Sequence, residues 1–153
     1  MDPERAMDCE LTHLISLITE IGKAYLNVVL SPAGMALYRV IAGEAPRFPE
    51  LGRRFYLAGP DAVVSSTARQ LSKAVQAGEI DVHETGVDAA ASLFISMVRG
   101  HAQMEAITHP ETRPSAAQVD HWVQLAVSTF LKAFSTQKRQ RNPSGLTTRI
   151  QLL

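Results

Sequence analysis

Apolar side chains recur along this chain at spacings of three and four, with polar residues between them. That spacing places the apolar residues on one face of an α-helix, whereas a half-buried strand needs strict alternation. The sequence has no strictly alternating stretch and none of the Asn-Gly or Asp-Gly pairs that are typical of tight hairpins. The pattern therefore predicts an all-α fold.

Proline and glycine divide the pattern into a bundle of five long helices and one short one. Ser31 and Ser115 each precede a predicted helix as an N-cap, and Ser115 with Gln118 forms a candidate capping box. The Gly59-Pro60 pair is expected to break the chain, and residues 79–86 to form a polar connector. The predicted helices span residues 10–30, 32–45, 49–58, 61–77, 87–107 and 116–134.

The last predicted helix carries an apolar arc that is wider than one packing contact needs. Such an arc indicates burial on two sides, one inside the subunit and one against a partner. We therefore expect a homodimer through the last two helices. The interface candidates are Val98, Ala102, Glu105, Val119, Trp122, Val123, Val127 and Phe130.

Length and charge narrow the functional classes. The 153 residues suit one compact domain. Lys and Arg number 15, as do Asp and Glu, so the basic excess expected of a nucleic-acid-binding domain is missing and we expect no nucleic-acid binding by this chain alone. No apolar run reaches the ~18 residues of a membrane span. The single Cys9 and the polar N-terminus favour the cytoplasm.

Candidate chemistry is sparse. The five histidines are dispersed, without a His-x-x-x-His spacing or a second cysteine, so the sequence predicts no metal site. It has no recognisable nucleophile motif and no glycine-rich phosphate loop. We therefore expect no cofactor and no enzymatic activity.

Several short stretches occur in an order and spacing that resemble one known family. They are Leu37-Tyr38-Arg39-Val40-Ile41, Glu44-Ala45, Phe48-Pro49-Glu50-Leu51, Phe55-Tyr56, Gly59-Pro60 and Ala77-Gly78-Glu79-Ile80. Together they resemble the C-terminal regulatory domain of TetR-type bacterial repressors, in particular the AefR-like branch. The resemblance covers residues 31–134.

The resemblance implies a four-helix bundle at a dimer interface, formed by the last two helices and their copies. It also implies a cavity among the earlier helices for a small, often apolar effector, which shifts the separation of two DNA-reading heads. Residues 1–30 would form a connector helix, 31–135 the effector-binding and dimerisation domain, and 136–153 a disordered polar tail. The pocket candidates, each of which could instead be plain core, are Met35, Tyr38, Phe55, Tyr56, Phe94, Met97 and His101.

The family's helix-turn-helix pattern is not found in residues 1–30. The favoured hypothesis is therefore the effector-sensing, dimerising half of a repressor, with DNA binding supplied by an absent head. The alternative is a truncated gene remnant, or an interaction module that pairs with intact paralogues through the same helices. The pair His101 and Glu105, one helical turn apart, could orient a ligand or form a satisfied pair at the interface rim.

Overall fold

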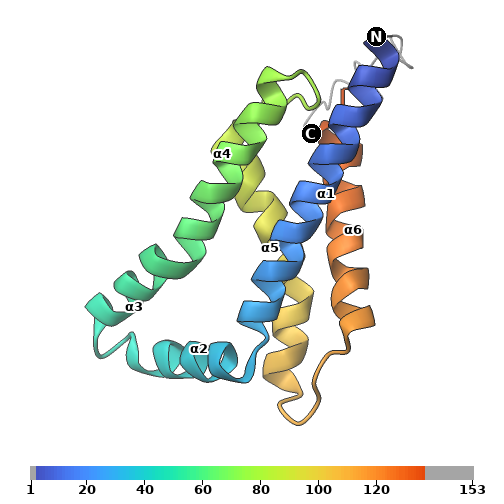
Figure 1. The fold of residues 1–153 in the computed structure, drawn as a ribbon. Coiled ribbons are helices and arrows are strands. Elements are labelled where there is room, and N and C mark those ends of the chain that lie inside the picture. The colour runs from blue at the N-terminus through green and yellow to red at the C-terminus, as the bar shows by residue number, and fades with distance from the viewer. Residues whose placement is uncertain (1–2, 137–153) are drawn as a thin grey trace, which may run out of the picture.

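The computed structural model describes residues 3–136, and its regular elements are all helical. The prediction of an all-α fold is confirmed, and the polar tail predicted for residues 136–153 lies outside the described residues apart from Thr136. Figure 1 shows the elements in chain order. They are α1 (Pro3–Val29), α2 (Pro32–Glu44), α3 (Pro49–Tyr56), the π-helical turn η1 (Leu57–Asp61), α4 (Ala62–Gln76), α5 (Val87–Thr108) and α6 (Ala116–Phe134).

The core lies where α1, α4, α5 and α6 pack together, with α5 contacting the other three. Phe94 of α5 and Phe130 of α6 are fully buried there, with their rings edge to face and centroids 5.4 Å apart. α1 and α6 approach closely at Gly22, because a Cβ built on Gly22 would lie 2.9 Å from Cγ1 of Val123. α1 is therefore a part of the core.

The helical winding continues from α3 through η1 into α4, so the predicted break at Gly59-Pro60 is wrong. Pro60 lacks an N–H and its ring disturbs a regular α-helix. The π turn takes up this defect, because its hydrogen bonds reach one residue further than those of an α-helix. The Gly59-Pro60 pair thus introduces a π-helical bulge and does not end the helix.

A sharp bend joins α1 to α2, whose axes differ by 67°. The Ser31 hydroxyl donates to the carbonyl of Val28 at 2.8 Å and accepts from the backbone N–H of Gly34 at 3.0 Å. Gly34 lies against the carbonyl of Val28, so closely that a side chain there would clash. The predicted N-cap at Ser31 is confirmed, and it fixes the direction in which α2 leaves the core.

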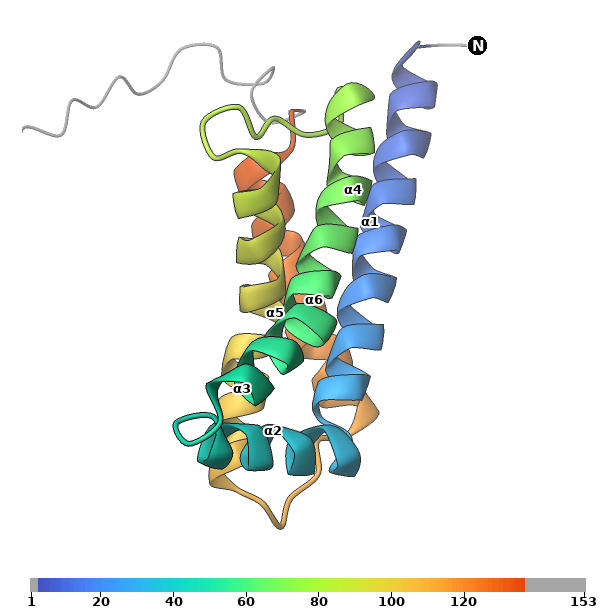
Figure 2. The same cartoon turned by 90° about the vertical axis from the view of Figure 1, so that its left-hand side faces the viewer.

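Helices α1 and α3–α4 lie close at one end and diverge toward the other, where α2 spans the distance between them (Figure 1). Figure 2, turned by 90°, shows α1 and α4 running side by side with α2 crossing their ends. This triangular frame stands in front of α5. It is the part of the fold that positions the candidate site.

The connector between α4 and α5 is more firmly held than a polar loop. Ile80 and Val82 are buried, and Ile80 forms an isolated antiparallel bridge with Ser135 after α6. The Thr136 hydroxyl donates to the carbonyl of Gly78 at 2.8 Å. The expectation of a polar connector over residues 79–86 therefore missed its two apolar anchors.

Among the described residues, no single helix has both the length and the hydropathy to cross a membrane. Residues 11–29 and 32–44 meet that test only when taken together across their 67° bend.

Candidate functional site

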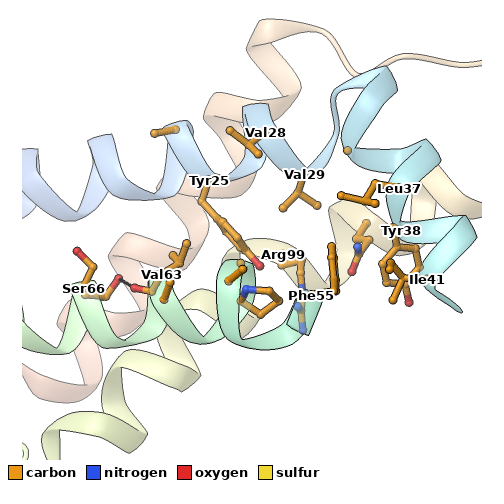
Figure 3. Close-up of a pocket in the computed structure, with 18 of the residues that line it drawn as sticks. Tyr25, Val28, Val29, Leu37, Tyr38, Ile41, Phe55, Val63, Ser66 and Arg99 are labelled. Atoms are coloured by element: carbon orange, nitrogen blue, oxygen red, sulfur yellow. Dashed lines mark hydrogen bonds between the residues drawn. The ribbon is translucent and has the colours of Figure 1, made fainter. Parts of the chain in front are cut away.

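The triangular frame encloses a cavity of about 950 Å³ (Figure 3). Its walls come from α1, α2, α3, η1 and α4, and α5 closes it from behind. The π turn contributes Ala58, Gly59 and Pro60 to the wall, so the defect in the helix lies at the cavity. The volume is of the size that small-molecule sites in proteins have.

Most of the cavity wall is apolar or aromatic. Tyr25 of α1 is buried and points into the cavity, as Figure 3 shows. Three of the large apolar side chains that line the cavity are exposed and so mark its mouth. They are Val28, Leu37 and Leu51.

The polar groups of the wall are few. Arg99 and Gln103, one turn apart on α5, both line the cavity. The Thr67 hydroxyl is already used, because it donates to the carbonyl of Val63 at 2.8 Å. Arg54 is 79% exposed, and its Nε lies 3.5 Å from Oε1 of Glu50.

Only two of the seven pocket residues predicted from the sequence line the cavity. Tyr38 and Phe55 line the cavity. Met35 is buried outside the lining, and Phe94 is buried in the core between α5 and α6. The other three candidates, which are exposed and lie outside the lining, are Tyr56, Met97 and His101.

Most of the predicted interface residues are enclosed within the subunit. Burial inside one chain leaves such side chains no surface to present to a partner, so the wide apolar arc of α6 is accounted for by α1 and α5 packing on two sides. Only Glu105 and Trp122 remain partly exposed. The buried six are Val98, Ala102, Val119, Val123, Val127 and Phe130.

A different set of side chains faces outward from the last two helices. The ring of His101 on α5 packs edge to face with that of Trp122 on α6, with centroids 6.1 Å apart, and Nε2 of His101 lies 3.5 Å from Oε2 of Glu105. Beside this pair, exposed apolar residues follow one face of α5, and one more lies on α6. We name this surface the α5–α6 outer face, formed by Leu93, Met97, Met104, Trp122 and Leu125.

No direct signal in the sequence identifies Arg99 or Tyr25 as cavity residues. Arg99 follows the buried Val98, and the helical period places it opposite the apolar face of α5, where a solvated arginine is the usual expectation. Tyr25 shares its apolar face with core residues of α1, and a helical period cannot distinguish a packed core from a cavity wall. Within the described residues, no group of three or more His, Cys, Asp or Glu side chains could hold a metal ion.

Comparison with known proteins connects this fold to transcription regulators. A family model described as the AefR-like transcriptional repressor, C-terminal domain, matches residues 16–136. The solved structure of a protein named Flavonoid-responsive Regulator FrrA superposes with a TM-score of 0.69 at 28% identity, covering 78% of this chain. This chain spans 60% of the length of FrrA.

A second solved structure shows the same fold. It is the crystal structure of a protein assigned to the TetR-family transcriptional regulators of Mesorhizobium loti MAFF303099, with a TM-score of 0.70. Its identity to this chain is 22%, and the match covers 87% of this chain and 69% of that one. No curated protein matches the chain.

Proposed function

The chain belongs to the AefR-like, TetR-type transcriptional repressors through their C-terminal domain, and from this we propose that residues 16–136 form a regulatory domain that senses a small-molecule effector. The family consists of transcription regulators and not of enzymes. The observation that carries the proposal is the 950 Å³ cavity, which lies beside the close-packed core of α1, α4, α5 and α6. The proposed role places the protein in the cytoplasm, with the DNA.

The cavity suits an effector with a mainly apolar body. Aromatic side chains on three of its walls offer stacking surfaces, and such contacts favour flat, unsaturated ligands. FrrA is named as responsive to flavonoids. An aromatic effector of comparable character would suit Tyr25, Tyr38 and Phe55 in this chain.

The mechanical consequence follows from the elements that form the wall. A ligand in the cavity contacts α1, α4 and the π turn at once, so it can favour one separation of α1 from α4 over another. A ligand shifts such an equilibrium only by its difference in affinity for the two arrangements. We propose that contact with operator DNA belongs to a helix-turn-helix head and not to residues 16–136.

We further propose that the domain forms a homodimer through the α5–α6 outer face. Leu93 is 50% exposed, Met104 60% and Leu125 49%, and exposed apolar side chains that cluster on one face are typical of an interface. This surface replaces the buried residues that the sequence pattern suggested. It keeps the interface on the last two helices.

The test of effector binding uses N-phenyl-1-naphthylamine, a neutral aromatic fluorophore that brightens in apolar sites. We expect saturable binding of one molecule per chain. Ala24→Trp fills the cavity from α1 and should abolish the signal, whereas the control Ala42→Trp, on the exposed side of α2, should leave it unchanged. Equal binding by both variants would place the fluorophore elsewhere and refute the proposal.

A further inference from the structure

The cavity carries positive charge without a compensating acid. Two arginines line it, and none of its lining residues is Asp or Glu. Arg54 is well exposed and has Glu50 as its ion-pair partner, so it is satisfied without a ligand. The uncompensated charge is that of Arg99.

Arg99 is half-buried on α5 and points into the cavity (Figure 3). Within the described part of the chain, its guanidinium makes no ion pair and no side-chain hydrogen bond. A guanidinium has five N–H donors in a planar fork that matches a carboxylate. Because no described side chain accepts from them, these donors depend on water for their hydrogen bonds.

A ligand that fills the cavity displaces this water and so raises the desolvation free energy of the charged Arg99 guanidinium. A neutral apolar ligand leaves the guanidinium desolvated without a counterion, which is unfavourable. A cationic ligand adds repulsion. An anionic group restores the lost hydrogen bonds with charge-assisted ones, which are roughly twice as strong as neutral ones.

Neighbouring polar groups support an acidic group at this place. Gln103 lies one turn after Arg99 on the same face of α5, and its side-chain amide can donate a further hydrogen bond. Tyr25 of α1 points into the same cavity and carries a phenolic O–H. The donors of Arg99, Gln103 and Tyr25 thus come from two elements, while most of the wall is apolar.

We propose that the effector is an organic acid: an aromatic or otherwise apolar body with an anionic group that pairs with Arg99. The proposal rests on the effector-binding function proposed above and names the chemical class of the ligand. Arg99 would then act as the residue that selects among ligands of equal size by their charge.

The test is calorimetric titration of the full chain with three ligands that share one ring system. They are 2-naphthoate, the neutral 2-naphthamide and protonated 2-naphthylmethylamine. We expect the acid to bind at least about tenfold more tightly than the amide, as a charged hydrogen-bond pair implies. The amine should bind more weakly than the amide.

Variants of Arg99 assign this preference to one side chain. Arg99→Gln should bring the affinities of acid and amide within about twofold, whereas Arg99→Lys should keep most of the preference for the acid. Arg69→Gln removes an exposed arginine of α4 outside the cavity and should change nothing. Thermal unfolding of each variant confirms that it is folded before it is titrated.

The possible failures are distinct. If the acid and the amide bind wild type equally, or if Arg99→Gln keeps the preference, the organic-acid proposal is refuted while the effector cavity stands. If none of the three ligands binds and the neutral fluorophore also fails, both proposals are refuted together.

Discussion

At the scale of single residues, the core depends on close contacts that small changes can test. Gly22 lets α1 approach α6, and its neighbour Val123 is fully buried with a stiff, branched side chain. Thr19 tests a different feature of the core, because its buried hydroxyl has no hydrogen-bond partner among the described residues. A buried polar group without a partner is unfavourable. Each of the two has a control residue in the same fold: Gly43 is a helical glycine without close neighbours, and Thr67 is a buried threonine whose hydroxyl is hydrogen-bonded.

Gly22→Ala should destabilise the fold by about 1–2 kcal/mol, because the added methyl group overlaps Cγ1 of Val123 and overpacking outweighs the gain in helix propensity. Gly43→Ala is the control. Its Cβ would meet nothing within 4 Å, so it should stabilise by about 0.5–1 kcal/mol. Urea unfolding followed by circular dichroism measures both. Equal shifts for the two variants would contradict close packing at Gly22.

Thr19→Val should stabilise the fold by about 1 kcal/mol, because it removes the unpartnered hydroxyl at nearly constant volume. Thr67→Val should do the reverse, with a loss of about 1 kcal/mol, since the Thr67 hydroxyl donates to the carbonyl of Val63. The opposite signs, measured in the same unfolding assay, are the result to look for. A loss of stability at Thr19 would mean that its hydroxyl has a partner after all.

At the scale of elements, local signals predicted what is locally determined. The helix expected over residues 116–134 is found as Ala116–Phe134, because Ser115 and Gln118 form a complete capping box at its start. Gly59-Pro60 is a strong local signal too, yet the packing of α3 and α4 on their neighbours keeps the chain helical through a π turn. The buried Ile80 is likewise fixed by a segment far along the chain, which no local pattern reveals.

Ser115→Ala should destabilise the fold by about 1 kcal/mol, because the backbone N–H of Gln118 loses the Ser115 hydroxyl that accepts its hydrogen bond. Ser115→Asp should stay within a few tenths of a kcal/mol of wild type, since its carboxylate accepts the same hydrogen bond from Gln118. Chemical denaturation separates the two. Wild-type stability in Ser115→Ala would show that the cap does not limit α6.

At the scale of the whole molecule, the fold divides into a packed half and an open half. The sequence indicated that Tyr38 and Phe55 could line a pocket, but it also assigned Phe94, which the structure buries in the core. The helical period identifies the inward face of each helix, but it does not show whether that face packs in the core or lines a cavity. The cavity arises from the divergence of α1 and α4 and from the 67° bend before α2, which are properties of the assembly.

The proposed dimer is tested at the same scale. Sedimentation equilibrium of the chain at several concentrations should give a dimer. The double variant Met97→Glu, Leu125→Glu should give a monomer, because it places charge on the α5–α6 outer face. Val40→Glu adds a charge at an exposed apolar site of α2 and should leave the dimer intact. A wild-type chain that stays monomeric at micromolar concentration would contradict the proposed interface.

We propose that the cavity between α1, α2, α3, α4 and α5 is the effector site. The most direct measurement is a two-dimensional amide NMR titration of this 16.7 kDa chain with 2-naphthoate. We expect saturable shifts concentrated at the lining residues, among them Tyr25, Tyr38, Phe55 and Arg99. Shifts confined to the α5–α6 outer face, or scattered weakly over the surface, would contradict it.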